Sequence, residues 1–60
     1  MFTLTIDTAN DAFGESFDDT AAELSRILAT VRQALLAGRS AGPVLDVNGN
    51  TVGRYDLTSR

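Results

Sequence analysis

A chain of 60 residues has room for one small hydrophobic core, so the sequence predicts a single domain over residues 1–60. It contains no cysteine and no histidine, which excludes disulfides and metal sites built on thiolate or imidazole ligands. The formal net charge of −3 also disfavours a general nucleic-acid binder, because affinity for phosphates needs clustered cations.

The small size bears on assembly as well. Domains of this size often add a disulfide, a metal or a partner chain to gain stability. Since disulfides are excluded, we predict a homodimer. No apolar run approaches the length of a membrane span, and the N-terminus lacks the basic-then-apolar layout of a signal peptide. The sequence therefore predicts a soluble intracellular protein with no membrane contact.

The first predicted element is a strand over residues 2–7. Phe2, Leu4 and Ile6 alternate with polar residues, which is the period of a half-buried strand. Residues 8–19 are rich in turn-forming residues and predict a loop. Phe13 and Phe17 interrupt that polarity, and we expect both to fold onto the core.

A helix is predicted over residues 20–37. Thr20 and Glu23 have the spacing of a capping box, in which each side chain satisfies a free N–H of the first turn, and Asp19 is the competing N-cap. Gly38 is the natural stop. The apolar residues follow the helical period and form one stripe: Leu24, Ile27, Leu28, Val31 and Leu35.

A β-hairpin is predicted over residues 44–57, with strands at 44–47 and 51–57. Asn48-Gly49 lies between them and favours a two-residue type I′ turn. Val52 and Tyr55 cannot share one face of a regular strand, so we expect a bulge at Gly53.

These elements predict an α+β fold in the order β-α-β-β, with one helix packed on a three-stranded sheet. A right-handed crossover favours the spatial order 1-3-2, and the alternative places strand one beside strand two. The helix is expected to cover one face of the sheet, made of Phe2, Leu4, Ile6, Leu45, Val47, Tyr55 and Leu57.

Little in the chain points to catalysis. Without histidine, cysteine or lysine, the commonest general base and the usual activated nucleophiles are missing, so we predict that the protein is not an enzyme and has no cofactor. Asp46, Asn48 and Asn50 match the start of a calcium loop. Thr51 and Leu57 replace the glycine and glutamate that such a loop requires, and no metal site is predicted.

The charges are unevenly distributed. Between residues 7 and 23 there are acids and no base, and Asp11, Glu15, Asp18 and Asp19 are the candidate partner-binding residues. Such a segment suits a partner protein with a basic surface, although acids in a loop and a first helical turn are also common without any partner. All the bases are arginines. Four of them, Arg26, Arg32, Arg39 and Arg54, could contact phosphates if a dimer gathered them.

Two motifs mark a resemblance over nearly the whole chain. Asn10-Asp11-Ala12-Phe13 follows the first strand, and the pattern D-x-N-G-N-x-x-G runs from Asp46 to Gly53. Together they resemble a family of very short proteins encoded by phages, prophages and their bacterial hosts, a family with no established activity. The resemblance implies an accessory protein of a mobile element that works in the host cytoplasm. It implies no catalytic residue.

The sequence therefore predicts a non-catalytic accessory protein that binds another protein through its acidic segment and modulates a host factor. The alternative is a small dimeric nucleic-acid-binding regulator that uses the four arginines.

Overall fold

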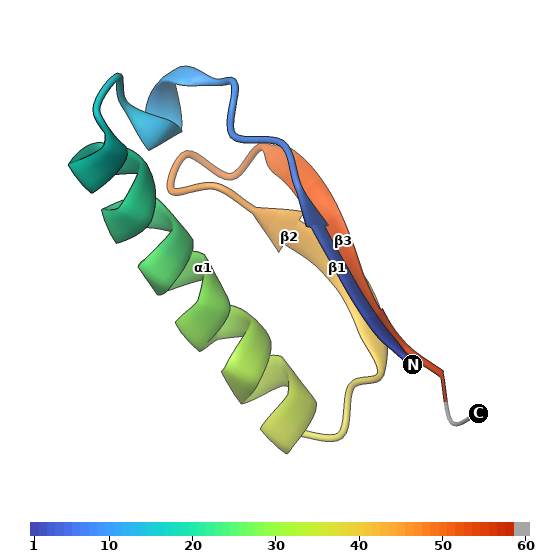
Figure 1. Ribbon diagram of the computed structural model, residues 1–60. Helices are drawn as coiled ribbons and strands as arrows, with labels where there is room; N and C mark the ends of the chain where they lie inside the picture. Colours follow the sequence, from blue (N-terminus) through green and yellow to red (C-terminus); the bar gives the residue numbers. More distant parts are fainter. Residues whose placement is uncertain (59–60) are drawn as a thin grey trace.

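The computed structural model describes residues 1–58 and has one helix on one side of a sheet (Figure 1). The elements are β1 (Phe2–Ile6), the 3₁₀ turn η1 (Asp11–Phe13), α1 (Phe17–Leu36), β2 (Ala41–Leu45) and β3 (Thr51–Leu57). The sheet is antiparallel with the strand order β1-β3-β2. The predicted α+β fold, its hairpin and the order 1-3-2 are confirmed, and the alternative with strand one beside strand two is wrong.

The helix begins earlier than predicted, at Phe17 instead of residue 20. The Ser16 hydroxyl accepts a hydrogen bond from the Asp19 amide at 3.0 Å, so Ser16 is the N-cap. Both predicted caps, Thr20 and Asp19, are wrong. The Thr20 hydroxyl instead donates to the Phe13 carbonyl at 3.0 Å and ties the helix to η1. The helix ends at Leu36, close to the predicted residue 37.

The hairpin turn is longer than predicted. The Gly49 amide donates to the Asp46 carbonyl at 3.0 Å, and the Asp46 amide donates to the Asn50 carbonyl at 2.9 Å. Gly49 has a φ of 86°, and every residue within 1–58 that has a positive φ is a glycine. Asn48 therefore lacks the positive φ that a type I′ turn at Asn48-Gly49 requires. A type I turn followed by a left-handed glycine is formed instead. The Asp46 carboxylate favours this longer turn because it accepts from the amides of Asn48 and Asn50.

Strand β2 lies at Ala41–Leu45 rather than 44–47, and this reverses the predicted faces. Val44 is buried against the helix layer, whereas Leu45 and Val47 are 46% and 63% exposed. Their placement in the covered face was wrong. The strand begins at Ala41 because Gly42 lies opposite Tyr55, and a Cβ at Gly42 would be only 2.9 Å from the Tyr55 hydroxyl.

The predicted bulge is present, one residue before Gly53. Val44 pairs with Gly53 and Leu45 pairs with Thr51, so Val52 is the extra residue. The bulge lets Val52 pack against the core while Tyr55 is also buried. Gly53 itself serves a close approach, because a Cβ there would collide with the Thr5 carbonyl.

The core is small and lies between α1, η1 and the sheet. It consists of Phe13, Ile27, Val31, Val44 and Tyr55, with Leu4 and Ile6 packed against it as predicted. Phe13 is fully buried, which at about 1.5–3 kcal/mol makes it a principal anchor of the loop. Phe17 does not fold onto the core and is 85% exposed, because the helix starts at this residue. Phe2 and Leu57 of the predicted face remain 43% and 46% exposed.

Across residues 1–58, the model has no helix with the length and apolar character needed to span a bilayer.

Candidate functional site

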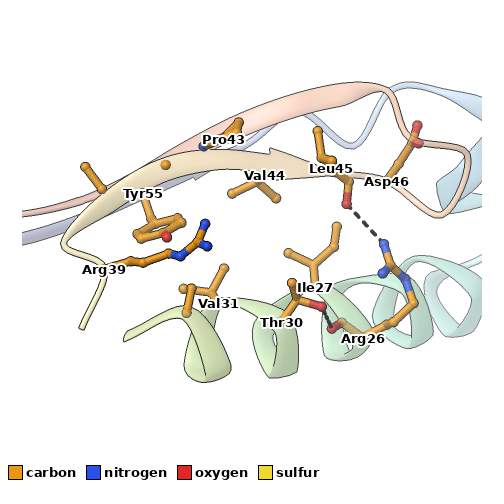
Figure 2. Close-up of a pocket in the computed structure, with 13 residues that line it drawn as sticks. Arg26, Ile27, Thr30, Val31, Arg39, Pro43, Val44, Leu45, Asp46 and Tyr55 are labelled. Carbon is orange, nitrogen blue, oxygen red and sulfur yellow. Dashed lines mark hydrogen bonds between the residues drawn. The ribbon is translucent and has the colours of Figure 1, made fainter. Parts of the chain in front are cut away.

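A groove runs between α1 and the outer side of β2 (Figure 2). Its cavity volume is about 450 Å³. Ile27 and Val31 of the helix and Val44 and Tyr55 of the sheet form its apolar floor. This volume and mostly apolar lining are within the range of small-molecule binding clefts, in which a few polar groups orient the ligand.

The two arginines of the groove differ in their bonding. Arg26 donates from Nε to Glu23 Oε1 at 2.9 Å and from Nη2 to Glu23 Oε2 at 3.0 Å. Its Nη2 also donates to the Leu45 carbonyl at 3.1 Å, as Figure 2 shows. Arg39 lies beside the Tyr55 ring in the same view, and no ion pair to Arg39 occurs within residues 1–58. Of the two groove arginines, Arg39 is therefore the one without an ion-pair partner within residues 1–58, and its guanidinium group could bind an anion.

Glu23 holds the helix to the hairpin and does not cap the helix. Its side chain is only 7% exposed, and Oε2 accepts from the Val47 amide at 2.9 Å. The hydrogen bond from Arg26 lowers the pKa of Glu23, and the Val47 amide lowers it further, against the opposing effect of burial. The predicted capping box is wrong. Helical spacing is the signal that was missed. Glu23 lies four residues before Ile27 and eight before Val31, so it belongs to the same buried stripe.

Asp46 organises the turn from the other side. Both carboxylate oxygens accept hydrogen bonds, Oδ1 from the amides of Asn48 and Asn50 at 2.9 Å each, and Oδ2 from Asn50 Nδ2 at 3.3 Å. Burial raises the pKa of Asp46, but these bonds outweigh burial and hold the pKa below its ordinary value. The calcium-loop residues thus bond to one another. Within the described chain no group of three or more acidic side chains is arranged to hold a metal ion.

The two motifs of the sequence meet in space. Asn10 Nδ2 donates to Asp46 Oδ2 at 2.9 Å, and Asn10 Oδ1 accepts from the Ala12 amide at 2.9 Å. One asparagine therefore caps η1, which carries Phe13, and joins it to the hairpin turn. The chemistry of this contact is structural.

The predicted partner-binding acids lie together at the N-terminal end of α1. Asp11 is in η1, Glu15 follows it, and Asp18 and Asp19 are in the first helical turn; all are exposed. Asp11 and Asp19 line a shallow hollow of about 320 Å³ between η1 and α1. None of these acids has an ion-pair partner in the part of the chain that the structure describes.

Sequence reasoning placed one neighbour of these acids, Phe17, in the core and so missed its exposure. Its side chain is 85% exposed and follows the Ser16 cap directly, next to Asp18. We call Asp11, Glu15, Phe17, Asp18 and Asp19 the acidic surface. The helix N-terminus makes it a favourable place for carboxylates, since the helix dipole is positive there.

The four arginines of the alternative function do not form a patch in one chain. Arg26 and Arg39 line the groove, and Arg26 is held by Glu23. Arg54 neighbours Tyr55 in β3 and so lies on the opposite face of the sheet, away from the helix. Arg32 is exposed on the helix.

Comparison with known proteins finds no matching family model, no matching curated protein and no matching solved structure.

Proposed function

We propose that this chain is a non-catalytic accessory protein that acts by binding another protein through the acidic surface. The observation that carries the proposal is Phe17, which is 85% exposed among carboxylates that lack internal cations within residues 1–58. Phenylalanine side chains are more often buried than exposed, and aromatic residues are frequent anchors of protein interfaces.

The chemistry of the surface describes its partner. The hollow is lined by Asp11 and Asp19 and by Arg26, whose charge is paired with Glu23, so its unpaired charge is negative and suits a lysine or arginine side chain. Phe17 beside it is suited to an apolar pocket. The partner we propose therefore has a basic surface with an apolar recess, as a protein that normally holds nucleic acid can have.

The resemblance to short phage and prophage proteins supports a host protein as this partner. A chain of 60 residues can affect such a protein by occupying its surface. We therefore propose modulation of a host factor as the concrete activity.

The test is capture of bacterial host proteins on the immobilised chain, with matched variants. We expect Asp18→Lys and Phe17→Ser to lose the retained partner, since each removes one half of the proposed recognition. Asp56→Lys and Leu36→Ser are the controls, because they change an exposed acid and a 68% exposed apolar residue elsewhere. Circular dichroism checks that each variant is folded. Equal losses in both sets would contradict the proposal.

The nucleic-acid alternative makes a separate prediction for the same protein. Binding to DNA or RNA that weakens steeply with salt, and that Arg39→Ala and Arg54→Ala reduce, would support it in place of the acidic surface.

A further inference from the structure

The outer edge of β1 is an open sheet edge. The Thr58 amide donates to the Met1 carbonyl at 2.9 Å, so the odd-numbered residues of β1 bond to β3. Residues alternate in an antiparallel ladder, so the N–H and C=O groups of Phe2, Leu4 and Ile6 point away from β3. Within residues 1–58, β1 pairs with β3 alone, so no strand lies against these groups. Such an edge is a template for another strand.

The outer edge of β2, in contrast, is protected. The Leu57 amide donates to the Ser40 carbonyl at 2.7 Å, so the even-numbered residues bond to β3 and the odd-numbered ones face outward. Pro43 has no N–H, and the Leu45 carbonyl already accepts from Arg26. Proline and arginine are common means of protecting a sheet edge. New strand pairing is therefore directed to β1.

Apolar side chains near β1 are incompletely covered. Phe2 and Leu57 lie opposite each other on the helix-facing side of the sheet, yet are 43% and 46% exposed. The groove residues Arg26 and Thr30 mark the flank of α1 beside β2. By the helical period, Leu28 lies on the opposite flank and is 50% exposed. Exposed apolar side chains that gather on one side of a molecule in this way are typical of a protein–protein interface.

We propose that a second copy of this chain pairs with β1. The two β1 strands run antiparallel about a two-fold axis at Leu4, and the two three-stranded sheets become one continuous sheet. Leu4 then lies opposite Leu4 of the partner copy, and Phe2 lies opposite Ile6 of the partner copy. Both helices lie on the same face, and Phe2 and Leu28 of each copy lie between them.

The choice of a second copy rests on self-complementarity. This register is the one that pairs all of the outward-facing residues, Phe2, Leu4 and Ile6, at once. Thr3 falls opposite Thr5 of the partner copy, a favourable cross-strand pair. No residue from Phe2 to Ile6 is charged, so no like charges oppose each other.

The interface must extend beyond the strands. A stable interface removes roughly 600–1,000 Å² from each partner, and the whole surface of the chain is 4326 Å². Strand pairing alone would bury less surface than such an interface requires. The exposed Phe2 and Leu28 side chains supply the remainder, and a dimer without them would not persist.

The first test is the solution mass measured by light scattering across concentration. We expect twice the mass of the 6.4 kDa chain at high concentration. Phe2→Glu should shift the protein to monomer, because it places a charge beside Ile6 of the partner copy. Leu45→Glu, at a site of similar exposure on the protected β2 edge, should remain a dimer. A monomer at all concentrations, or equal effects of both variants, would overturn the proposal.

Amide hydrogen exchange of the unmodified protein tests the register independently of any variant. We expect the amides of Phe2, Leu4 and Ile6 to become protected as concentration rises, whereas those of Thr3 and Thr5, which already face β3, are protected throughout. In mixed isotopically labelled samples, an intermolecular Hα–Hα contact from Thr3 to Thr5 should appear. A dimer in which Phe2, Leu4 and Ile6 exchange freely would overturn this pairing.

Discussion

At the scale of single residues, a polar cluster holds this small molecule together. Glu23 and Asp46 are each less than a tenth exposed, and each uses both carboxylate oxygens as acceptors. Buried side-chain polar atoms within residues 1–58 all have partners. Because a buried carboxylate without partners is strongly disfavoured, the turn geometry and the position of α1 depend on each other.

Acid should therefore weaken the fold. Both carboxyl groups have a folded-state pKa below the ordinary values of 4.5 for Glu23 and 3.8 for Asp46. Their contribution is complete above these values, and it is lost as the pH falls through them toward the folded-state pKa values. We expect the urea midpoint to be constant near neutral pH and to fall below about pH 5.

Variants identify the groups responsible. Glu23→Gln and Asp46→Asn should lower the midpoint at pH 7 and flatten its dependence on pH. Asp56→Asn, which changes an exposed carboxylate of β3, serves as the control. An unchanged acid slope in both variants would show that other carboxyl groups cause the loss.

At the scale of elements, the type and order of each element could be predicted because the patterns were strong. Alternation identified β1, and the i, i+3, i+4 stripe identified α1. The bulge was predicted from a conflict in parity between Val52 and Tyr55. The start of β2 was missed because Ala41-Gly42-Pro43 carries no alternation, and the segment is a strand through its pairing with β3, where Gly42 lies opposite Tyr55.

The start of α1 was missed for a different reason. Ser16, Asp19 and Thr20 are all residue types that favour the N-cap, and the sequence prediction chose between Thr20 and Asp19 without considering Ser16. In the structure Ser16 is the cap, and Thr20 lies inside the helix, where its hydroxyl donates to the Phe13 carbonyl of η1. The same shift makes Phe17 the first residue of α1, and its exposure there was not predicted.

The cap can be tested directly. Ser16→Ala should lower the free energy of unfolding by about 1 kcal/mol, because the Asp19 amide loses its acceptor. Ser25→Ala, in the exposed middle of α1, should leave stability equal or slightly higher, since alanine is the better helix former. Chemical denaturation of both variants distinguishes these results, and equal effects would exclude Ser16 as the cap.

At the scale of the whole molecule, the charges are distributed by position in the fold. The acidic surface lies at the N-terminal end of α1, whereas Arg54 and Asp56 share the outer face of the sheet and offset each other. The proposed dimer places its two acidic surfaces at opposite ends of one sheet. It leaves Arg26 and Arg39 on the flank beside β2, away from the partner copy, so it does not gather all four arginines into one patch.

Assembly should also appear in thermal unfolding. Because association binds only the folded chain, the midpoint should rise by a few degrees for each tenfold increase in protein concentration. In Phe2→Glu the midpoint should not depend on concentration. A midpoint independent of concentration in the unmodified chain as well would argue that each copy folds alone.

The contact between Asn10 and Asp46 has a consequence for how such a sequence can vary. These residues are far apart in the chain, yet each completes the hydrogen bonding of the other. A change at one position alters the cost of a change at the other, so their effects on stability will not add. We therefore expect paired replacements of Asn10 and Asp46 to be tolerated better than a replacement of either residue alone. In a set of related chains, positions 10 and 46 should therefore co-vary.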